Sequence, residues 1–332
     1  MNVSNQVVHQ LPISVVVPTR NRNIPLSRMF ESLALQSAQP AELLVVDAST
    51  GDETQRLCDG HIAGLSSRIR YHRAHETGAA VQRDQGVKLA TEDVVLFLDD
   101  DIIFEAQCVE RLWNALQSDS RLGGVNAMIT NQRYLAPGRL SRSLFRVLNG
   151  RDEPSYAGKC IGPALNILPE DDPKLPEITP VEWLNTTCTM YRRNALPVPL
   201  FPKLFTGYSL MEDLALSLTV AQKWKLANAR TARIFHDSQP ADYKSDQSKL
   251  AEMELVNRHF IMTRILSRNR TRDYAKLGLL EVFGIVTPLV SASAWRTLPA
   301  VLAGKVRGIR SIAQRRGRDS VIADNGNQVM SA

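Results

Sequence analysis

The sequence predicts an α/β fold: a mostly parallel sheet flanked by helices, followed by a C-terminal helical appendage. Three observations predict it. Short apolar runs alternate with segments of helical composition in the N-terminal part. Polar residues cluster where three of these runs end. Towards the C-terminus the chain turns basic and strand patterns disappear. Its 332 residues suit one large domain with an appendage.

The N-terminal part contains four expected strands and three expected helices. Strands are expected at the apolar runs Ile13–Val17, Leu43–Val46 and Val94–Leu98, and a further strand at Ile69–His72. The helices are expected at Leu26–Leu35, Gly78–Ala90 and Glu105–Leu116. This alternation favours parallel strands joined by helical crossovers.

The middle of the chain is rich in proline. Nine of the 17 prolines fall between Pro154 and Pro202, so little regular structure is expected there. We interpret this segment as a loop over a ligand site or as a connector. The other elements expected are strands at Val181–Tyr191 and Ala232–Phe235 and helices at Met211–Leu226 and Glu252–Arg264.

The C-terminal region combines basic and apolar residues. From Ile261 to Ala332 there are 12 Lys/Arg against 4 Asp/Glu, whereas the whole chain has a net charge of +6. The longest uncharged run within Leu277–Gly304 is Val282–Trp295, which has 14 residues. A membrane span needs about 20. We therefore expect a helical hairpin on a bilayer surface, with packing on the domain or in a homo-oligomer, and a true span, as alternatives.

Basic residues near this hairpin favour an anionic membrane leaflet. They are Arg264, Arg268, Arg270, Arg272, Lys305, Arg307, Arg310, Arg315, Arg316 and Arg318. A basic tail of this kind also occurs in proteins that bind nucleic acid, but we expect no nucleic-acid partner.

The four cysteines are far apart and form no CxxC pair. This argues against a zinc ribbon and favours free, buried thiols. The N-terminus lacks a basic leader followed by a long apolar core, so we expect no signal peptide and a cytoplasmic location.

Three adjacent aspartates, Asp99 to Asp101, follow the buried strand Val94–Leu98. In an extended chain Asp99 and Asp101 point to the same side. Paired carboxylates suit Mg²⁺ or Mn²⁺ carrying a diphosphate. The alternative is a solvated acidic turn before the next helix.

Two more polar clusters, Thr19–Arg22 and Asp47–Thr50, also follow strands. Ligands of open α/β sheets bind at the carboxyl ends of strands, so the three clusters predict one site. The turn PTRNRN after the first strand contains no glycine, which argues against a dinucleotide fingerprint.

Five segments together resemble glycosyltransferase family 2, a family of inverting nucleotide-sugar transferases with the GT-A (Rossmann-like) fold. They are SVVVPTRNR, VVDAST, GAAVQRDQGV, FLDDD and GYSLMED, in the family's order and spacing over roughly residues 12 to 240. Two positions depart from the pattern. Ala48 stands where the family often has glycine, and Asp84 where it often has asparagine.

The resemblance implies a metal-dependent hexosyltransferase that uses a UDP, dTDP or GDP sugar and Mg²⁺ or Mn²⁺. The acceptor would be a saccharide or a lipid-linked saccharide in bacterial polysaccharide or lipopolysaccharide biosynthesis. The protein would lie peripherally on the inner face of the cell membrane. Residues 1–240 would form the GT-A domain, with a nucleotide-binding half at 12–130 and an acceptor-binding half at 131–240, and residues 241–332 the C-terminal region.

The resemblance also implies roles for residues near the nucleoside. Pro18, Thr19 and Arg20 would hold the nucleoside through the turn. Asp47 would accept an N–H from the base, with a helix cap or turn role as the alternative.

Asp99 and Asp100 would contact the donor, Asp99 through the ribose or a metal-bound water. Asp101 would bind the metal, together with Asp99. His236, at the end of the last expected strand, would bind the metal or the diphosphate, and a structural histidine is the alternative.

Arg83 would reach a phosphate as a charge-assisted donor, unless it pairs with Glu76 or Asp84. Trp183 would stack on the acceptor sugar, unless it is a core residue.

Met211-Glu212-Asp213 opens an expected helix, where a carboxylate is favoured by the helix dipole. By the family pattern Asp213 would be the general base that deprotonates the acceptor hydroxyl, with Glu212 as the alternative.

Two other functions are considered. A sugar-phosphate nucleotidyltransferase also joins an α/β nucleotide site to acidic metal ligands, but it usually has a Gly-rich, Lys-containing loop after the first strand. A catalytically degenerate transferase-like module would instead bind a partner through its basic tail.

Overall fold

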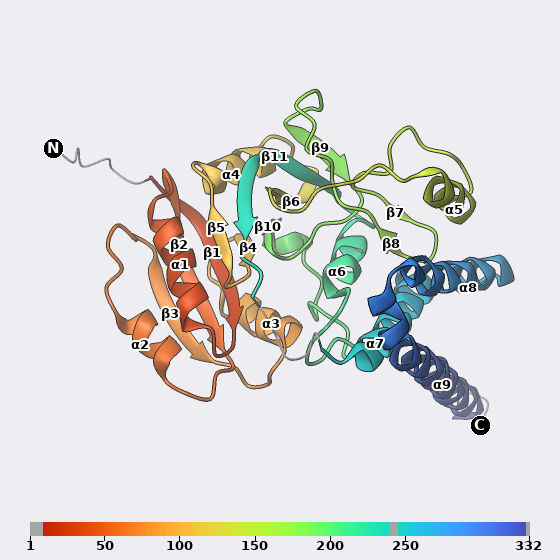
Figure 1. The fold of residues 1–332 in the computed structure, drawn as a ribbon. Coiled ribbons are helices and arrows are strands. Elements are labelled where there is room, and N and C mark those ends of the chain that lie inside the picture. Colours follow the sequence, from red (N-terminus) through yellow and green to blue (C-terminus); the bar gives the residue numbers. More distant parts are fainter. Residues whose placement is uncertain (1–8, 240–244, 330–332) are drawn as a thin grey trace. The chain divides into compact units, whose positions relative to one another are not determined.

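The computed structural model describes residues 9–239 and 245–329 (Figure 1). Its centre is a nine-stranded sheet in the order β3-β2-β1-β4-β10-β6-β11-β5, with β9 added beside β11. The α/β class expected from the sequence is confirmed. The contacts divide the chain into two compact units: residues 1–137, 153–160 and 166–239, and residues 138–152, 161–165 and 240–332.

The first half of the sheet is parallel. It consists of β1 (His9–Thr19), β2 (Ala38–Asp47), β3 (Arg68–Arg73) and β4 (Val94–Leu98). β1, β2 and β4 are almost continuous apolar runs, as strands covered on both faces require. The four strands that the sequence predicts here are all present.

The second half of the sheet is mixed. β10 (Cys188–Arg192) runs antiparallel to β4 and to β6 (Leu122–Ile129). β11 (Lys225–His236) is parallel to β6 and antiparallel to β5 (Ile102–Phe104) and β9 (Ile178–Val181). Two short strands, β7 (Cys160–Ile161) and β8 (Leu165–Asn166), form a separate pair.

Helices cover both faces of the sheet. Helices α1 (Asn23–Ala34) and α4 (Cys108–Gln117) bury their apolar faces in the main core with Ile13, Val15 and Val17 of β1. Helix α3 (Ala79–Leu89) lies on the opposite face, where a Cβ at Gly86 would be 2.3 Å from Cγ1 of Val16. Alternate residues of β1 thus serve two layers.

Several boundaries differ from the sequence-based expectation. The helix expected to reach Leu226 is α6 (Glu212–Val220), because Leu226 pairs with Gly124 of β6 at the start of the long β11. The strand expected at Val181–Tyr191 is divided between β9 and β10. Helices α2 (Glu53–Asp59) and α5 (Arg139–Asn149) and strands β5 and β6 were not anticipated.

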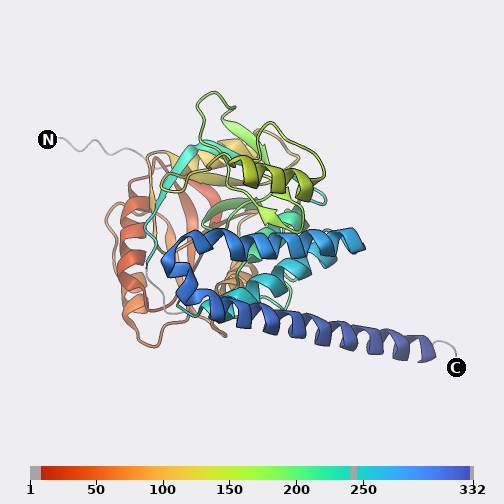
Figure 2. The ribbon, with the colours of Figure 1, turned by 45° about the vertical axis from the view of Figure 1, so that its right-hand side comes forward.

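The C-terminal unit is helical. It contains α5, α7 (Gln247–Phe260), the π-turn Ile261–Ile265, α8 (Thr271–Val286), the short turn Thr287–Val290 and α9 (Ala292–Val329) (Figure 2). α8 and α9 are joined by that turn into a hairpin. α9 packs closely on α7. At Gly304 of α9, an added Cβ would lie only 2.1 Å from the carbonyl oxygen of Ser248 in α7.

Buried charges within the C-terminal unit are paired. Arg258, which is 6% exposed, lies 2.6 Å from Glu254 and 3.4 Å from Glu281. Lys305 of α9 lies 2.8 Å from Glu254 and 2.6 Å from Glu281. These pairs join α7, α8 and α9, and each cation is compensated.

No helix in the described residues is long and apolar enough to cross a membrane. All four cysteines are free and buried, as the sequence predicts. The side chains of Arg315, Arg316 and Arg318, which the sequence analysis assigns to an anionic leaflet, lie outside the described residues.

Glu42 of β2 links the neighbouring parallel strands through hydrogen bonds near their amino-terminal ends. Its carboxylate accepts hydrogen bonds from Ser14 Oγ at 2.6 Å, Arg70 Nη1 at 2.7 Å, and the N–H and hydroxyl of Thr91, both at 2.8 Å. Burial acts to raise the pKa of Glu42, but these hydrogen bonds outweigh it and lower the pKa to about 2.

Glu42→Gln should therefore lower the free energy of unfolding at neutral pH by about 2–3 kcal/mol. Because the folded-state pKa is depressed, the contribution is present above about pH 4.5 and is lost as the pH falls towards 2. Urea denaturation at several pH values should show the difference from the wild type shrinking over this range. Glu76→Gln, at an exposed position, is the control. A difference that is constant down to pH 2 would contradict this account.

Candidate active site at the carboxyl edge of the sheet

Three strand ends meet at one edge of the sheet. Thr19 and Asp47 are register partners at the ends of β1 and β2, and Thr19 Oγ1 donates to Asp100 Oδ2 at 2.7 Å just beyond β4. Gln82 of α3 joins the same edge by donating to the carbonyl oxygens of Thr19 and Val46, at 2.9 and 2.7 Å. The polar clusters that the sequence places in one site are thus adjacent.

Arg22 is the main counter-ion of the buried aspartates. Its Nη1 lies 2.7 Å from Asp100 Oδ1 and its Nη2 3.1 Å from Asp101 Oδ2. Both carboxylates are almost fully buried, with side-chain exposures of 4% and 5%. Burial raises the pKa of Asp100 to about 7, although Arg22 and Thr19 act in the opposite direction. Arg22 thus offsets the electrostatic repulsion between the two carboxylates, which is strong because they are buried.

Asp101 is also held by the end of β11. Its Oδ1 lies 3.1 Å from His236 Nε2, and its Oδ2 accepts the N–H of Gln239 at 3.3 Å. Burial acts to raise the pKa of Asp101, but His236, Arg22 and this N–H together hold it below its ordinary value. The pKa shifts therefore keep Asp101 ionised more firmly than Asp100.

Asp99, Asp101 and His236 could together hold a metal ion. One ligand atom from each lies within 4.8 Å of the others. Two carboxylates and an imidazole are a donor set that fits Mn²⁺ or Mg²⁺ with coordination positions left over for a ligand. The chemistry of these residues therefore fits the ion that the sequence predicts.

Arg83 links the acidic turn to α6. Its side chain is 3% exposed, with Nη2 at 2.6 Å from Asp99 Oδ1 and Nη1 at 3.1 Å from Glu212 Oε1. These are ion pairs with site carboxylates, and not with Glu76 or Asp84, which the sequence analysis considered. Nε of Arg83 is buried and makes no hydrogen bond in the described structure. A contact between Arg83 and a phosphate stays a prediction.

Glu212 and Asp213 begin α6, and their environments differ. Burial and neighbouring Asp213 raise the pKa of Glu212 to about 8, and Arg83 acts against them. Burial also raises the pKa of Asp213, to about 6, against a hydrogen bond from the N–H of Leu214 and the charge of Arg83. Among the described residues Asp213 makes no side-chain ion pair, whereas Glu212 is paired with Arg83.

A backbone contact holds the Arg83 and Glu212 segments together. Gly78, just before α3, forms an isolated parallel bridge with Gly207, which precedes α6. Gly78 has φ of +150°, and a Cβ there would be 2.8 Å from the carbonyl oxygen of Gly207. Only glycine fits this approach, which explains the glycine that opens the GAAVQRDQGV segment.

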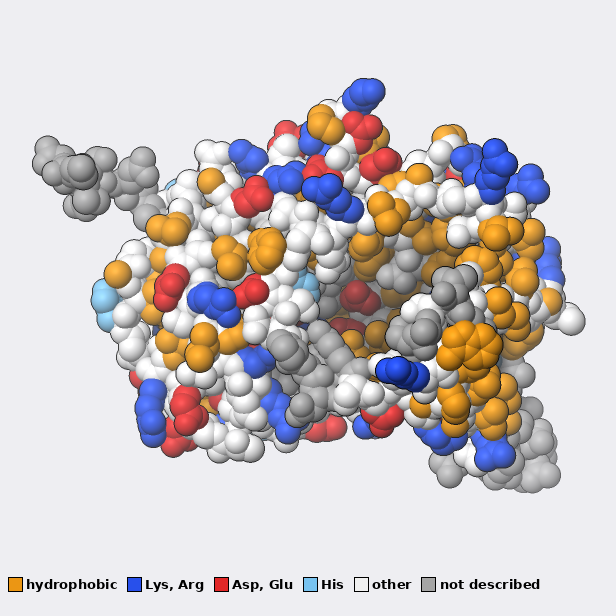
Figure 3. Space-filling model, in the orientation of Figure 1, with side chains coloured by type: hydrophobic (Ala, Val, Ile, Leu, Met, Phe, Trp, Pro, Cys, Tyr) orange, Lys and Arg blue, Asp and Glu red, His pale blue; other side chains and the backbone are white. Residues whose placement is uncertain are grey.

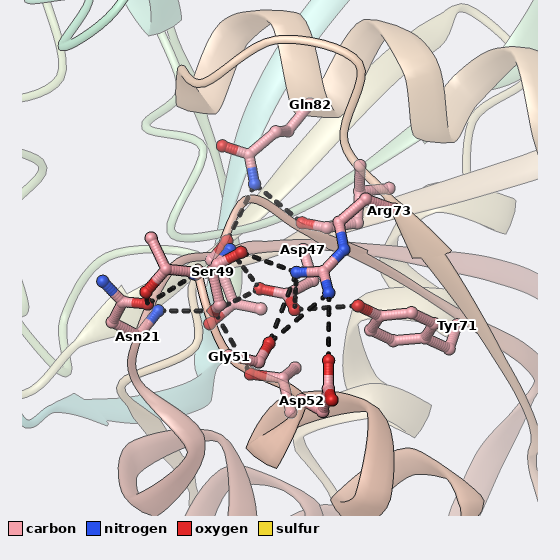
Figure 4. A network of polar contacts seen from close by, with 12 residues as sticks. Asn21, Asp47, Ser49, Gly51, Asp52, Tyr71, Arg73 and Gln82 are labelled. Atoms are coloured by element: carbon pink, nitrogen blue, oxygen red, sulfur yellow. Dashed lines mark hydrogen bonds and ion pairs between the residues drawn. The ribbon is translucent and has the colours of Figure 1, made fainter.

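Asp47 is the centre of a polar network beside this site (Figure 4). The carboxylate is fully buried and accepts bonds from the N–H and hydroxyl of Ser49 and, at 3.0 Å, from the hydroxyl of Tyr71. Arg73 Nη1 lies 3.6 Å from it and donates to the carbonyl oxygen of Ser49 at 2.6 Å. Asp47 thus shapes the turn, and a contact with a base stays a prediction.

The remaining predicted residues are placed as follows. Pro18 lies in β1 opposite Val46, and Arg20 is exposed immediately after the strand. Trp183 is 6% exposed, and its Nε1 donates to the carbonyl oxygen of Ile167 at 2.8 Å. The structure brings together Asp99 to Asp101, Arg83 and His236, but it shows no polar contact between Trp183 and them in the described residues.

Sequence reasoning missed four residues that organise the site: Arg22, Gln82, Tyr71 and Arg73. Arg22 belongs to the polar cluster PTRNR but was given no role, and only its proximity to the aspartates in space reveals one. Tyr71 and Arg73 lie in β3, whose pairing with β2 brings them next to Asp47.

Residues 14–163 match the sequence profile described as Glycosyl transferase family 2. A curated relative, the PGL/p-HBAD biosynthesis glycosyltransferase of Mycobacterium bovis (strain BCG / Pasteur 1173P2), is 32% identical over 138 residues. This match covers 40% of the present chain and 54% of that protein. The chain thus spans about half the length of the curated relative.

Two solved structures share the fold. Mannosyltransferase PcManGT from Pyrobaculum calidifontis, in complex with GDP-Man and Mn²⁺, has a TM-score of 0.51 at 15% identity, covering 95% of this chain and 81% of that one. S. aureus TarS 1-349, in complex with UDP-GlcNAc, has a TM-score of 0.50 at 17% identity and covers 92% of both chains. These likenesses confirm the GT-A arrangement expected from the sequence.

Arg22→Ala should lower the melting temperature in metal-free buffer, because Asp100 and Asp101 would lose their shared cation. Mn²⁺ should then stabilise the variant more than the wild type, since it would supply the missing positive charge. Differential scanning fluorimetry with EDTA and with Mn²⁺ measures both effects. Arg121→Ala, which breaks only an exposed pair with Asp119, is the control. Equal Mn²⁺-induced shifts in Arg22→Ala and wild type would contradict the prediction.

Proposed function

We propose, from the match of residues 14–163 to the glycosyltransferase family 2 profile, that the chain is an inverting glycosyltransferase. It transfers a hexosyl group from a nucleoside diphosphate sugar to an acceptor hydroxyl. One observation carries the proposal. A potential metal-binding set, Asp99, Asp101 and His236, lies at the carboxyl edge of the sheet and is joined through Arg83 to the carboxylates that begin α6.

In the proposed site Asp99, Asp101 and His236 hold Mg²⁺ or Mn²⁺. When bound, the ion supplies positive charge that stabilises the departing nucleoside diphosphate. Arg22 keeps Asp100 and Asp101 in position from the other side. Arg83 orients Asp99 and Glu212, and its guanidinium favours a phosphate nearby.

Asp213 is proposed as the general base. The acceptor oxygen attacks the anomeric carbon while its proton passes to Asp213, and the bond from that carbon to the diphosphate oxygen breaks. Asp213 suits this role because no arginine in the described part of the chain pairs with it, whereas Glu212 is held by Arg83. Ser217 Oγ donates to the carbonyl oxygen of Asp213 at 2.7 Å and accepts the N–H of Leu184, which fixes the start of α6.

The nucleoside is proposed to lie against the turn after β1 and the Asp47 network. Thr19 and Arg20 border the turn, and Asp47 would share its carboxylate between the protein and a base N–H. The solved relatives with this fold hold GDP-Man or UDP-GlcNAc. We therefore propose a UDP, dTDP or GDP sugar as the donor.

The acceptor is proposed to be a saccharide or a lipid-linked saccharide, used at the inner face of a bacterial membrane. The C-terminal unit supports this through the apolar side chains that it exposes, with basic residues at their edges (Figure 3). They include Leu279, Val282, Val286, Trp295 and Leu302. Amphipathic helices of this kind bind anionic bilayer surfaces.

A donor screen tests the proposal. The purified chain should hydrolyse or transfer from one of the UDP, GDP or dTDP sugars only with Mg²⁺ or Mn²⁺, releasing the nucleoside diphosphate. Asp101→Asn and Asp213→Asn should each reduce turnover by about 10²–10⁴-fold. Asp119→Asn, at a partly exposed position outside the site, should leave turnover unchanged. Release of pyrophosphate from a nucleoside triphosphate and a sugar phosphate would instead identify a nucleotidyltransferase.

The pH dependence of turnover distinguishes the two candidate bases. A base works only when deprotonated, so activity should rise with pH through the pKa of the base. Asp213 predicts a rise centred near pH 6, and Glu212 predicts one near pH 8. Measurement of kcat from pH 5 to 9 in the wild type and in Glu212→Gln decides between them. A rise near pH 8 that Glu212→Gln removes would assign the base to Glu212.

A further inference from the structure

The C-terminal unit contains a basic cavity of about 440 Å³ that the proposed reaction does not use. Its walls are the end of α5, the turn at Gly162 and Pro163, the buried Met262 and the start of α8. The charged residues that line it are Arg268, Arg270, Arg272, Asp273 and Lys276. Four cations thus face one carboxylate.

Two of these cations are fixed in place without being neutralised. Arg268 Nη1 donates to the carbonyl oxygen of Gly162, and Lys276 Nζ donates to that of Leu148 at 2.7 Å. Both side chains are partly buried. Neither lies within ion-pair distance of a carboxylate of the described residues. A carbonyl oxygen orients a cation but does not compensate its charge. Both groups can therefore bind an anion.

The single carboxylate of the cavity is already in use. Asp273 Oδ2 accepts the N–H of Arg270 at 2.9 Å, as in a capping box, and Oδ1 is 3.9 Å from Arg272 Nε. Elsewhere in the same unit, Arg258 and Lys305 are paired with glutamates. The unit therefore compensates its other partly buried cations and leaves an excess of positive charge here.

We propose that this cavity binds a phosphate group, as a monoester or a diphosphate. The fork of Arg268 and the ammonium group of Lys276 would donate to its oxygens, and Arg270 and Arg272 would add charge at the rim. The dipole of the 16-residue helix α8 adds to the positive potential. The site is independent of the proposed glycosyl transfer, because all of its residues belong to the C-terminal unit.

The phosphate could be carried by a soluble compound or by a lipid headgroup. The face of α8 that carries Lys276 continues with Leu279 and Val286, which are 42% and 55% exposed. A lipid could place its phosphate in the cavity and its chains along this face. The cavity would recognise the phosphate in the same way in both cases. An experiment is therefore needed to distinguish a soluble ligand from a lipid.

The test is binding by the full chain in EDTA, which removes metal-dependent binding at the other site. Calorimetric titration with inorganic phosphate and pyrophosphate measures the soluble source. Flotation with phosphatidylcholine vesicles that contain either phosphatidic acid or phosphatidylglycerol measures the lipid source, because only phosphatidic acid presents a phosphate monoester.

Arg268→Gln and Lys276→Gln should each weaken binding by about tenfold. Arg310→Gln, an exposed arginine of α9 outside the cavity, should leave it unchanged. Because Arg268 and Lys276 also support the backbone, Arg272→Gln serves as a second variant: it should weaken binding without changing the melting temperature.

If the cavity variants bind phosphate or pyrophosphate more weakly than the wild type but bind vesicles equally well, the proposal is supported and the ligand is soluble. If the cavity variants bind only the phosphatidic acid vesicles more weakly than the wild type, the proposal is supported and the ligand is a lipid. The proposal is overturned if neither ligand binds, or if the cavity variants bind phosphate, pyrophosphate and both vesicles as the wild type does.

Discussion

The placement of three adjacent aspartates against two arginines is the constraint on which the site depends. Asp99, Asp100 and Asp101 leave a fully buried strand, where uncompensated carboxylates would be strongly destabilising. Arg22, in the turn after β1, forms ion pairs with both Asp100 and Asp101, and Arg83 of α3 forms one with Asp99. The acidic turn can therefore be buried and still carry negative charge. Such a charge at the sheet edge favours binding of a divalent cation.

The same electrostatics gathers segments that are far apart in the chain. Arg83 spans from Asp99 to Glu212, and His236 reaches Asp101 from the end of β11. The backbone contact between Gly78 and Gly207 brings the start of α3 to the segment before α6 without intervening side chains. The proposed metal ligands and a pair of carboxylates with raised pKa values are thus held by shared partners, so that a change at Arg83 would disturb both.

The two compact units use charge differently. In the sheet-containing unit, carboxylates are concentrated at one strand edge and arginines compensate them. In the C-terminal unit, glutamates compensate the buried cations of α7 and α9, and positive charge is left over around one cavity at the start of α8. The first arrangement suits a cation and the second an anion, and each follows from which sign of charge the unit leaves unpaired.

The sequence by itself determined the alternating strands and helices, the polar clusters after β1, β2 and β4, and the resemblance of residues 14–163 to a known family, because these depend on local patterns. It also placed His236 at a strand end and Glu212 and Asp213 at a helix start. Tertiary structure alone decided the mixed second half of the sheet, where Leu226 leaves a helical pattern to pair with Gly124. It alone decided that Arg22 and Arg83 would meet the aspartates, and that Arg268 and Lys276 would share a cavity. The physical reason is that hydrophobic periodicity acts over a few residues, whereas ion pairing and strand pairing depend on distances in space that no local pattern encodes.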